Sequence, residues 1–182
     1  MRLVPAVFLS VFVCFSIVSS QDREYQIKAE FLERFTRFIE WPADPAVSGP
    51  SNQFTLCIIG KDPFGPYLTE LATAVKIQNK QILLRNIDST KEIEACNLLF
   101  ISNSEKLNLP NILNHTRTKP ILTVADSPGF GERGVLINFY QADAFIRFEI
   151  NRSAVEQSRL RFSSRLLKLG RLIDTDNLRQ TP

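Results

Sequence analysis

Histidine, methionine and tryptophan are almost missing from this chain, which has 182 residues and only one of each. The single histidine, His115, argues against a zinc centre, because such a site needs several ligands and a lone His with a paired set of Cys does not supply them. We therefore expect no metal site. Composition leaves room for a Ser-His-Asp triad, but the G-x-S-x-G turn of a typical hydrolase is absent. A hydrolase using His115 stays open, and a surface histidine is the simpler interpretation.

Glycine-rich nucleotide motifs are also missing. Gly60 and Gly65 have the spacing of the two glycines in a P-loop, but Pro66 and Tyr67 stand where that loop needs Lys and then Ser or Thr. The chain has no G-x-G-x-x-G motif either. We expect Gly60 to form a plain turn after a strand, and we expect no cofactor.

An excess of charge of one sign is lacking too. The 22 basic and 19 acidic residues give a formal net charge of +3. Binding to a phosphate backbone needs clustered Lys and Arg, so this balance argues against a nucleic-acid partner. The hydrophobic fraction of 44% is enough for a real core, and 14 phenylalanines make that core aromatic.

Long apolar runs are confined to the N-terminus. One positive charge at Arg2 precedes the apolar run Leu3–Val18, and Val18 and Ser20 suit the −3 and −1 positions of a signal-peptide cleavage site. The run is shorter than the ~20 residues that span a bilayer, which disfavours the alternative of an uncleaved anchor. We expect residues 1–20 to be a signal peptide that is cleaved near Ser20, which makes the mature protein periplasmic.

The rest of the chain is expected to form one domain over residues 21–176, followed by a polar tail over 177–182. Cysteine is scarce in it. With Cys14 in the leader, only Cys57 and Cys96 remain. An even pair in an exported chain favours a disulfide, and two buried free thiols are the alternative.

The hydrophobic patterns predict an α/β fold with three layers, in which helices flank a mostly parallel sheet. A Phe-rich helix comes first, and strands then alternate with helices. An antiparallel hairpin and a closing amphipathic helix follow. The predicted helices are Tyr25–Trp41, one from Pro63 to about Val75 with Asp62 as a possible cap, Asp88–Ala95, a weak Ser104–Asn114 interrupted by Pro110, one starting at Ser153, and Arg165–Ile173. The predicted strands are Phe54–Ile59, Gln81–Ile87, Asn97–Ile101, Pro120–Ala125, Val135–Tyr140 and Phe145–Ile150.

Two aspartates directly follow predicted strands. In open α/β sheets, ligands bind outside the carboxyl ends of the strands. Asp62 and Asp126 are therefore candidate ligand-binding residues, with the loop Ser127–Gly134 beside them. A helix cap, a turn aspartate and an ordinary surface loop are the simpler interpretation. The ligand-binding alternative makes the protein a periplasmic receptor or sensor subunit for a small ligand.

Four blocks of sequence, taken in order, resemble the YfiR family of exported bacterial proteins. They include the motifs KAEFLERFTRFIEWP, FTLCIIGKDPFG, GVLINF with IRFEIN, and SSRLLKLGRLI. The blocks are Lys28–Pro42, Phe54–Gly65, Leu122–Asn151 and Ser163–Ile173. Gly170 stands where the family often has alanine, which implies a slightly weaker last helix.

The resemblance implies regulation and no catalysis. YfiR is a periplasmic repressor of an inner-membrane diguanylate cyclase, and an outer-membrane lipoprotein relieves this repression. The resemblance thus implies an exported, non-enzymatic protein that represses such a partner in cyclic-di-GMP signalling. It also implies homodimers and a disulfide between Cys57 and Cys96. A second disulfide of YfiR has no counterpart in this sequence.

Overall fold

The computed structural model describes residues 20–42 and 52–175. Most of the predicted signal peptide, the loop predicted over 43–51 and the polar tail lie outside these residues. Among the residues described, no helix is both long and apolar enough to cross a membrane.

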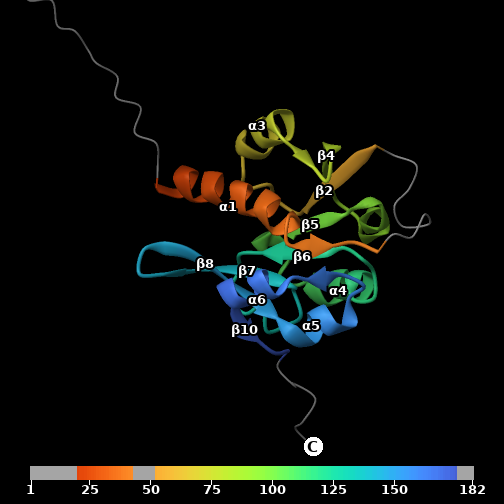
Figure 1. Cartoon of the computed structure of the whole chain (residues 1–182), viewed down its shortest axis with the longest axis vertical. Helices are drawn as coiled ribbons and strands as arrows, with labels where there is room; N and C mark the ends of the chain where they lie inside the picture. Colours follow the sequence, from red (N-terminus) through yellow and green to blue (C-terminus); the bar gives the residue numbers. More distant parts are fainter. Residues whose placement is uncertain (1–19, 43–51, 176–182) are drawn as a thin grey trace, which may run out of the picture.

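A sheet of eight strands forms the centre of the molecule (Figure 1). Across the sheet the order is β10 (Arg171–Ile173), β8 (Phe145–Asn151), β7 (Ile137–Ala142), β6 (Leu122–Ala125), β5 (Leu98–Ile101), β2 (Gln53–Ile59), β4 (Lys80–Ile87) and β3 (Lys76–Ile77). The neighbours from β4 to β7 pair in parallel, whereas β7 with β8 and β3 with β4 are antiparallel. The predicted fold class is thereby confirmed.

Helices cover both faces of this sheet. They are α1 (Ser20–Thr36), α3 (Tyr67–Ala74), α4 (Leu109–Thr116), α5 (Arg152–Gln157) and α6 (Ser164–Leu169), with the 3-10 helices η1 (Thr90–Ala95) and η2 (Asn103–Glu105). α1 packs beside α3, and α4 packs beside η1. In Figure 1, α1 runs alongside the β7–β8 hairpin, whose turn projects from the left of the molecule.

Two apolar cores result, because successive side chains of a strand point to opposite faces. On β2, Leu56 and Ile58 belong to the core under α1 and α3, whereas Cys57 and Ile59 belong to the core under η1 and α4. The Phe-rich stripe of α1 fills the first core. Its Phe35 ring lies 4.9 Å from the ring of Phe148.

The first predicted helix ends earlier than its sequence pattern indicated. α1 stops at Thr36, and Ile39 and Glu40 form the short strand β1. This strand pairs antiparallel with β9 (Arg161–Phe162), which lies far along the chain. Local periodicity could not show this pairing, because the partner strand is distant in sequence.

The helix predicted to begin at Pro63 also differs. α3 begins at Tyr67, and Pro66 occupies its N-cap position. The chain from Gly60 to Phe64 is instead a turn in which Asp62 Oδ1 accepts a hydrogen bond from the Phe64 amide at 2.8 Å. Asp62 is therefore a turn residue and not a helix cap, which corrects that part of the prediction.

Three further boundaries were wrong. Asn151, not Ser153, caps α5, because its Oδ1 accepts a hydrogen bond from the Ala154 amide at 2.8 Å. Pro110 lies in the first turn of α4, where its missing N–H costs nothing, so it starts the helix and does not interrupt it. The last predicted helix is α6 followed by the edge strand β10, which pairs parallel with β8.

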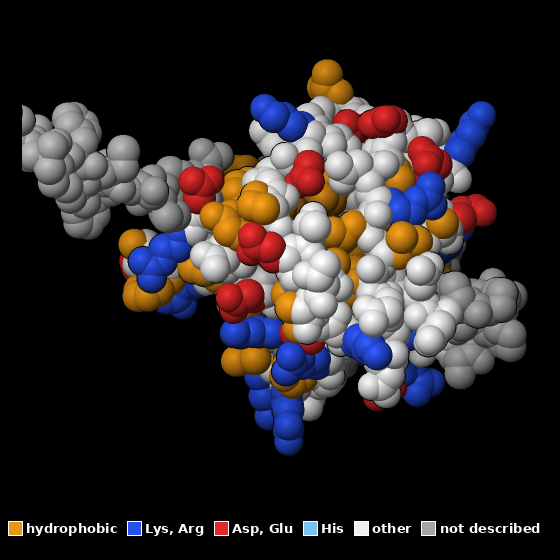
Figure 2. Space-filling view, turned by 90° about the horizontal axis from the view of Figure 1, so that it is seen from above, with side chains coloured by type: hydrophobic (Ala, Val, Ile, Leu, Met, Phe, Trp, Pro, Cys, Tyr) orange, Lys and Arg blue, Asp and Glu red, His pale blue; other side chains and the backbone are white. Residues whose placement is uncertain are grey.

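The surface charge is mixed. The face seen in Figure 2 carries acidic, basic and apolar side chains next to one another, and Lys and Arg crowd together only at its lower border. The basic residues near the end of the chain do not share one helix face. Arg161 lies on β9, Arg165 and Lys168 lie on α6, and Arg171 lies on β10.

Candidate functional site

Cys57 and Cys96 form a disulfide, as predicted. It joins Cys57 on β2 to Cys96, which follows η1, with a Cα–Cα distance of 5.8 Å. Both residues lie in the core under η1 and α4. The bond therefore holds η1 against the centre of the sheet and leaves neither sulfur free for chemistry.

Asp126 lies in a cleft of about 450 Å³ at the carboxyl end of β6. Its side chain is only 8% exposed and accepts hydrogen bonds from Lys28 Nζ at 2.7 Å and from the Tyr25 hydroxyl at 2.9 Å. Lys28 also contacts Glu24 Oε1 at 2.5 Å, and Gln141 Nε2 donates to Glu24 Oε2 at 2.7 Å. These ion pairs and hydrogen bonds across the cleft link α1 to the sheet.

The Tyr25 hydroxyl is held in its protonated form. Burial raises the pKa of Tyr25 above its usual value of 10.0, and the charge of Asp126, its hydrogen bond and the charge of Glu24 raise it further. The ring lies 5.4 Å from the ring of Phe64, edge to face. Tyr25 therefore connects the turn after Asp62 with Asp126, although Asp62 itself is not among the residues that line the cleft.

The far wall of the cleft comes from β7, β8 and β10. Arg171 donates to Glu149 Oε2 at 2.5 Å, and Asn138 Nδ2 donates to Glu149 Oε1 at 3.0 Å. The hydrogen bond with Glu149 raises the pKa of Arg171. The Arg171 guanidinium also lies 4.3 Å from the centre of the Tyr140 ring.

Gly131 makes room for this wall. A Cβ at this position would collide with the Glu149 carboxylate and would lie 2.9 Å from the Ile173 side chain. Gly131, in the loop predicted over Ser127–Gly134, is thus a glycine that the wall of the cleft requires.

Sequence reasoning proposed Asp126, which lies in the cleft, but it missed the groups that surround this residue. Asn138 and Glu149 gave the clearest signal, because each is a polar residue between two apolar neighbours in its strand. Lys28 gave another, because it lies on the Phe-rich side of α1 and is 4% exposed. Buried polar groups need partners, so such residues mark places where strands and helices exchange hydrogen bonds.

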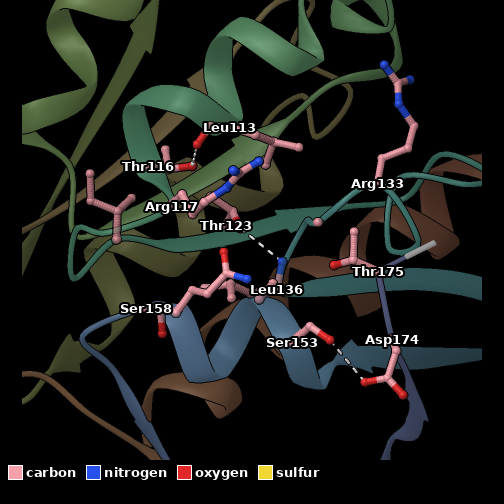
Figure 3. A pocket seen from close by; sticks show the side chains of 14 residues that line it. Leu113, Thr116, Arg117, Thr123, Arg133, Leu136, Ser153, Ser158, Asp174 and Thr175 are labelled. Carbon is pink, nitrogen blue, oxygen red and sulfur yellow. Dashed lines mark hydrogen bonds between the residues drawn. The ribbon is translucent and has the colours of Figure 1, made fainter. Parts of the chain in front are cut away.

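A second cavity, of about 620 Å³, lies between α4, β6 and α5 (Figure 3). Thr123 Oγ1 accepts a hydrogen bond from the Leu136 amide at 3.0 Å, and Ser153 donates to Asp174 at 3.2 Å. Figure 3 shows Arg133 turned away from the cavity, and its guanidinium donates to the Lys106 carbonyl at 3.3 Å. No residue proposed from sequence as a site lies here apart from the end of the glycine-rich loop.

His115 and the turn glycines give no sign of catalysis. His115 Nδ1 lies 2.8 Å from the carbonyl oxygen of Asn111, one turn earlier on α4. Gly60 has a φ of +88° and a Cβ there would collide with Ser104, so this glycine serves a turn. Within residues 20–42 and 52–175, no group of three or more His, Cys, Asp or Glu side chains could hold a metal ion.

Comparison with known proteins gives one family. The model of the YfiR/HmsC-like family matches residues 25–171, from the second turn of α1 to the first residue of β10. No curated protein matches the chain. Because the match covers most of the chain, the protein belongs to the YfiR/HmsC-like family.

Proposed function

We propose that this member of the YfiR/HmsC-like family is an exported, non-enzymatic regulator that binds and represses a membrane-bound diguanylate cyclase. The family match over residues 25–171 carries the proposal, since it spans nearly the whole folded domain and the family points to periplasmic regulation of cyclase signalling. The disulfide between Cys57 and Cys96 supports an oxidising compartment such as the periplasm.

The cleft beside Asp126 supports a binding role over a catalytic one. Asp126, Glu149 and Glu24 each accept a hydrogen bond or ion pair from a neighbouring side chain. A general acid or base needs a proton to exchange with a substrate, whereas these carboxylates are engaged in fixing α1 and β10 to the sheet.

The partners are part of the same proposal. They are an inner-membrane sensor with a cyclase domain, an outer-membrane lipoprotein that relieves repression, and a second copy of this chain. β10 is an edge strand, and Leu172 on it is 45% exposed, which leaves a sheet edge for a partner.

Light scattering of the mature protein tests the homodimer. It should give twice the mass of one chain, and a mass of one chain contradicts the homodimer.

The cyclase proposal is tested by deletion of the gene. We expect cellular cyclic-di-GMP and biofilm formation to rise, and expression of the full chain in trans to restore the original level. A matched strain that carries an inactive cyclase should show no rise. Unchanged cyclic-di-GMP after deletion would contradict repression of a cyclase.

A second candidate function is a periplasmic receptor for a small ligand. The cleft of about 450 Å³ beside Asp126 favours it, because it lies outside the carboxyl end of a parallel strand. A ligand that binds only the folded protein raises its melting temperature by mass action, whereas a repressor that binds only proteins shows no shift in a small-molecule screen.

A further inference from the structure

We infer that the cleft beside Asp126 binds an organic cation, namely a primary ammonium group of a small amine or of a lysine side chain. The inference gives the second candidate function a ligand class and rests on that function. Repression of a cyclase is measured separately, by the cyclic-di-GMP level, so the two can fail independently.

The charge of the cleft is the first argument. Four carboxylates and two cationic side chains line it, a formal balance of −2. The carboxylates are Glu24, Asp126, Glu132 and Glu149, and the cations are Lys28 and Arg171. Lys28 and Arg171 are engaged by buried carboxylates, and Glu132 is exposed at the cleft without a hydrogen-bond partner in the part of the chain that the structure describes. An entering cation therefore meets an excess of negative charge.

A hydrogen-bond acceptor without a donor is the second argument. Asn138 lines the cleft and is 2% exposed. Its two amide hydrogens are used by the Ser127 carbonyl at 3.1 Å and by Glu149 Oε1 at 3.0 Å, which fixes the orientation of the amide. Its Oδ1 is then left with no hydrogen-bond partner among the residues that the structure describes. Such a buried acceptor is costly unless a donor reaches it, and an ammonium group is a donor only.

One aromatic ring of the cleft fits the same kind of ligand. Tyr140 lines the cleft, and the Arg171 guanidinium lies 4.3 Å from the centre of its ring, so this ring already packs against a cation. Lys28 makes a similar contact with Tyr25 beside the cleft, at 4.4 Å from the ring centre. The half-buried Tyr140 ring also offers apolar surface to the carbon chain of an amine.

A metal ion fits less well. Hard divalent cations need several oxygen ligands in one coordination shell. In the described ranges, no three carboxylate, His or Cys side chains come close enough to supply them. The carboxylates of the cleft are spread along its walls, which suits a group with several directed N–H donors.

The test is an NMR titration of mature protein with cadaverine and with the blocked peptide acetyl-Gly-Lys-Gly-amide. The matched neutral probes are 1,5-pentanediol and the peptide with norleucine in place of lysine. We expect amide shifts in the segment from Asp126 to Glu132 and in β7, and a shift of the Asn138 side-chain amide. The amine or lysine probe should bind about tenfold more tightly than its neutral match, and added salt should weaken it. Tighter binding of cadaverine would indicate a free amine, and tighter binding of the peptide would indicate a partner's lysine.

Two variants with the same change in charge complete the test. Glu132→Gln removes an exposed carboxylate of the cleft and should weaken amine binding about threefold to tenfold. Glu156→Gln removes an exposed carboxylate on α5, away from the cleft, and should leave binding unchanged. Equal affinity for amine and diol, no shifts with either amine, or equal effects of the two variants would overturn the inference.

Discussion

At the scale of single residues, Lys28 has the most unusual surroundings. It is a buried cation held between Glu24 and Asp126, while the next acid–base pair on α1, Glu30 with Arg34, is exposed. Exposed ion pairs contribute little to stability, whereas removal of one partner from a buried pair leaves a charge that nothing compensates. Two ion pairs with the same i,i+4 spacing on one helix therefore contribute differently to the free energy of unfolding.

Lys28→Met should lower the free energy of unfolding by about 3 kcal/mol, because Asp126 keeps its charge and loses its cation. Arg34→Met is the matched control and should change stability by less than about 1 kcal/mol. Urea unfolding followed by circular dichroism measures both. The double variant Lys28→Met with Asp126→Leu should recover most of the loss, and equal losses in the two single variants would contradict the role of burial.

The raised pKa of Tyr25 predicts that the folded protein loses stability at alkaline pH. Its pKa is raised in the folded protein above the usual 10.0, so above pH 10 the unfolded chain loses this proton before the folded chain does. The contribution of Tyr25 is present below pH 10 and is lost as the pH rises towards the folded pKa. Between pH 9 and pH 11, the unfolding midpoint of the native protein should fall more than that of Tyr25→Phe. Tyr67→Phe is the control, and an unchanged pH profile in Tyr25→Phe would refute the link.

Gly170 is required by packing. The resemblance implied that alanine there would strengthen a helix, but α6 ends at this residue and a Cβ would lie 2.8 Å from Phe148 and 2.9 Å from Ile150. Gly170→Ala should therefore destabilise by about 1–3 kcal/mol through overpacking. Leu169→Ala, which removes a neighbouring side chain that is 70% exposed, should change stability by about 0.5 kcal/mol or less. A stabilised Gly170→Ala protein would restore the helix interpretation.

At the scale of elements, the disulfide and the cleft fix different parts of the sheet. The disulfide closes a loop with a sequence separation of 39 and holds β2, η1 and β5 together. The charged cleft holds α1 and β10 to the hairpin of β7 and β8. One half of the domain is thus held covalently and the other electrostatically.

Loss of the disulfide should cost about 4 kcal/mol in the chain-entropy model for a loop of this length. The Cys57→Ala/Cys96→Ala variant should unfold at a lower urea concentration than the oxidised protein, and the reduced native protein should behave in the same way. A mass measurement without reductant tests the bond itself, because two free thiols add the mass of two hydrogens. If oxidised and reduced proteins unfold at the same midpoint, the bond contributes nothing to stability.

At the scale of the whole molecule, export and folding are compatible. The predicted cleavage near Ser20 falls at the first residue of α1, which leaves Glu24, Tyr25 and Lys28 in the mature chain. We expect the N-terminal sequence of the periplasmic protein to begin at Gln21. A retained leader in the membrane fraction would support the anchor alternative, and a variant with Ser20→Leu should slow processing and serves as the control.

The order of elements could be predicted because it depends on local patterns. The run from Phe54 to Ile59 is apolar throughout and becomes a central strand, and the short link after Tyr140 becomes a hairpin. The ends of elements could not be predicted where a distant strand decides them. Ile39 and Leu172 fit a helical stripe in sequence, and both lie in strands because β9 and β8 offer partners.

The sequence by itself determined the fold class and the family, because these follow from apolar periodicity and from motifs in order. Its even count of cysteines favoured a disulfide, and the structure decided for that bond over two free thiols. It also proposed Asp126 as a ligand-binding residue, by its place after a strand. Only the tertiary structure decided what surrounds Asp126, since Lys28, Asn138, Glu149 and Arg171 come from four different elements. Side chains separated by about a hundred residues come into contact there, because the sheet brings the ends of its strands under α1. Local sequence patterns do not predict contacts over such a separation.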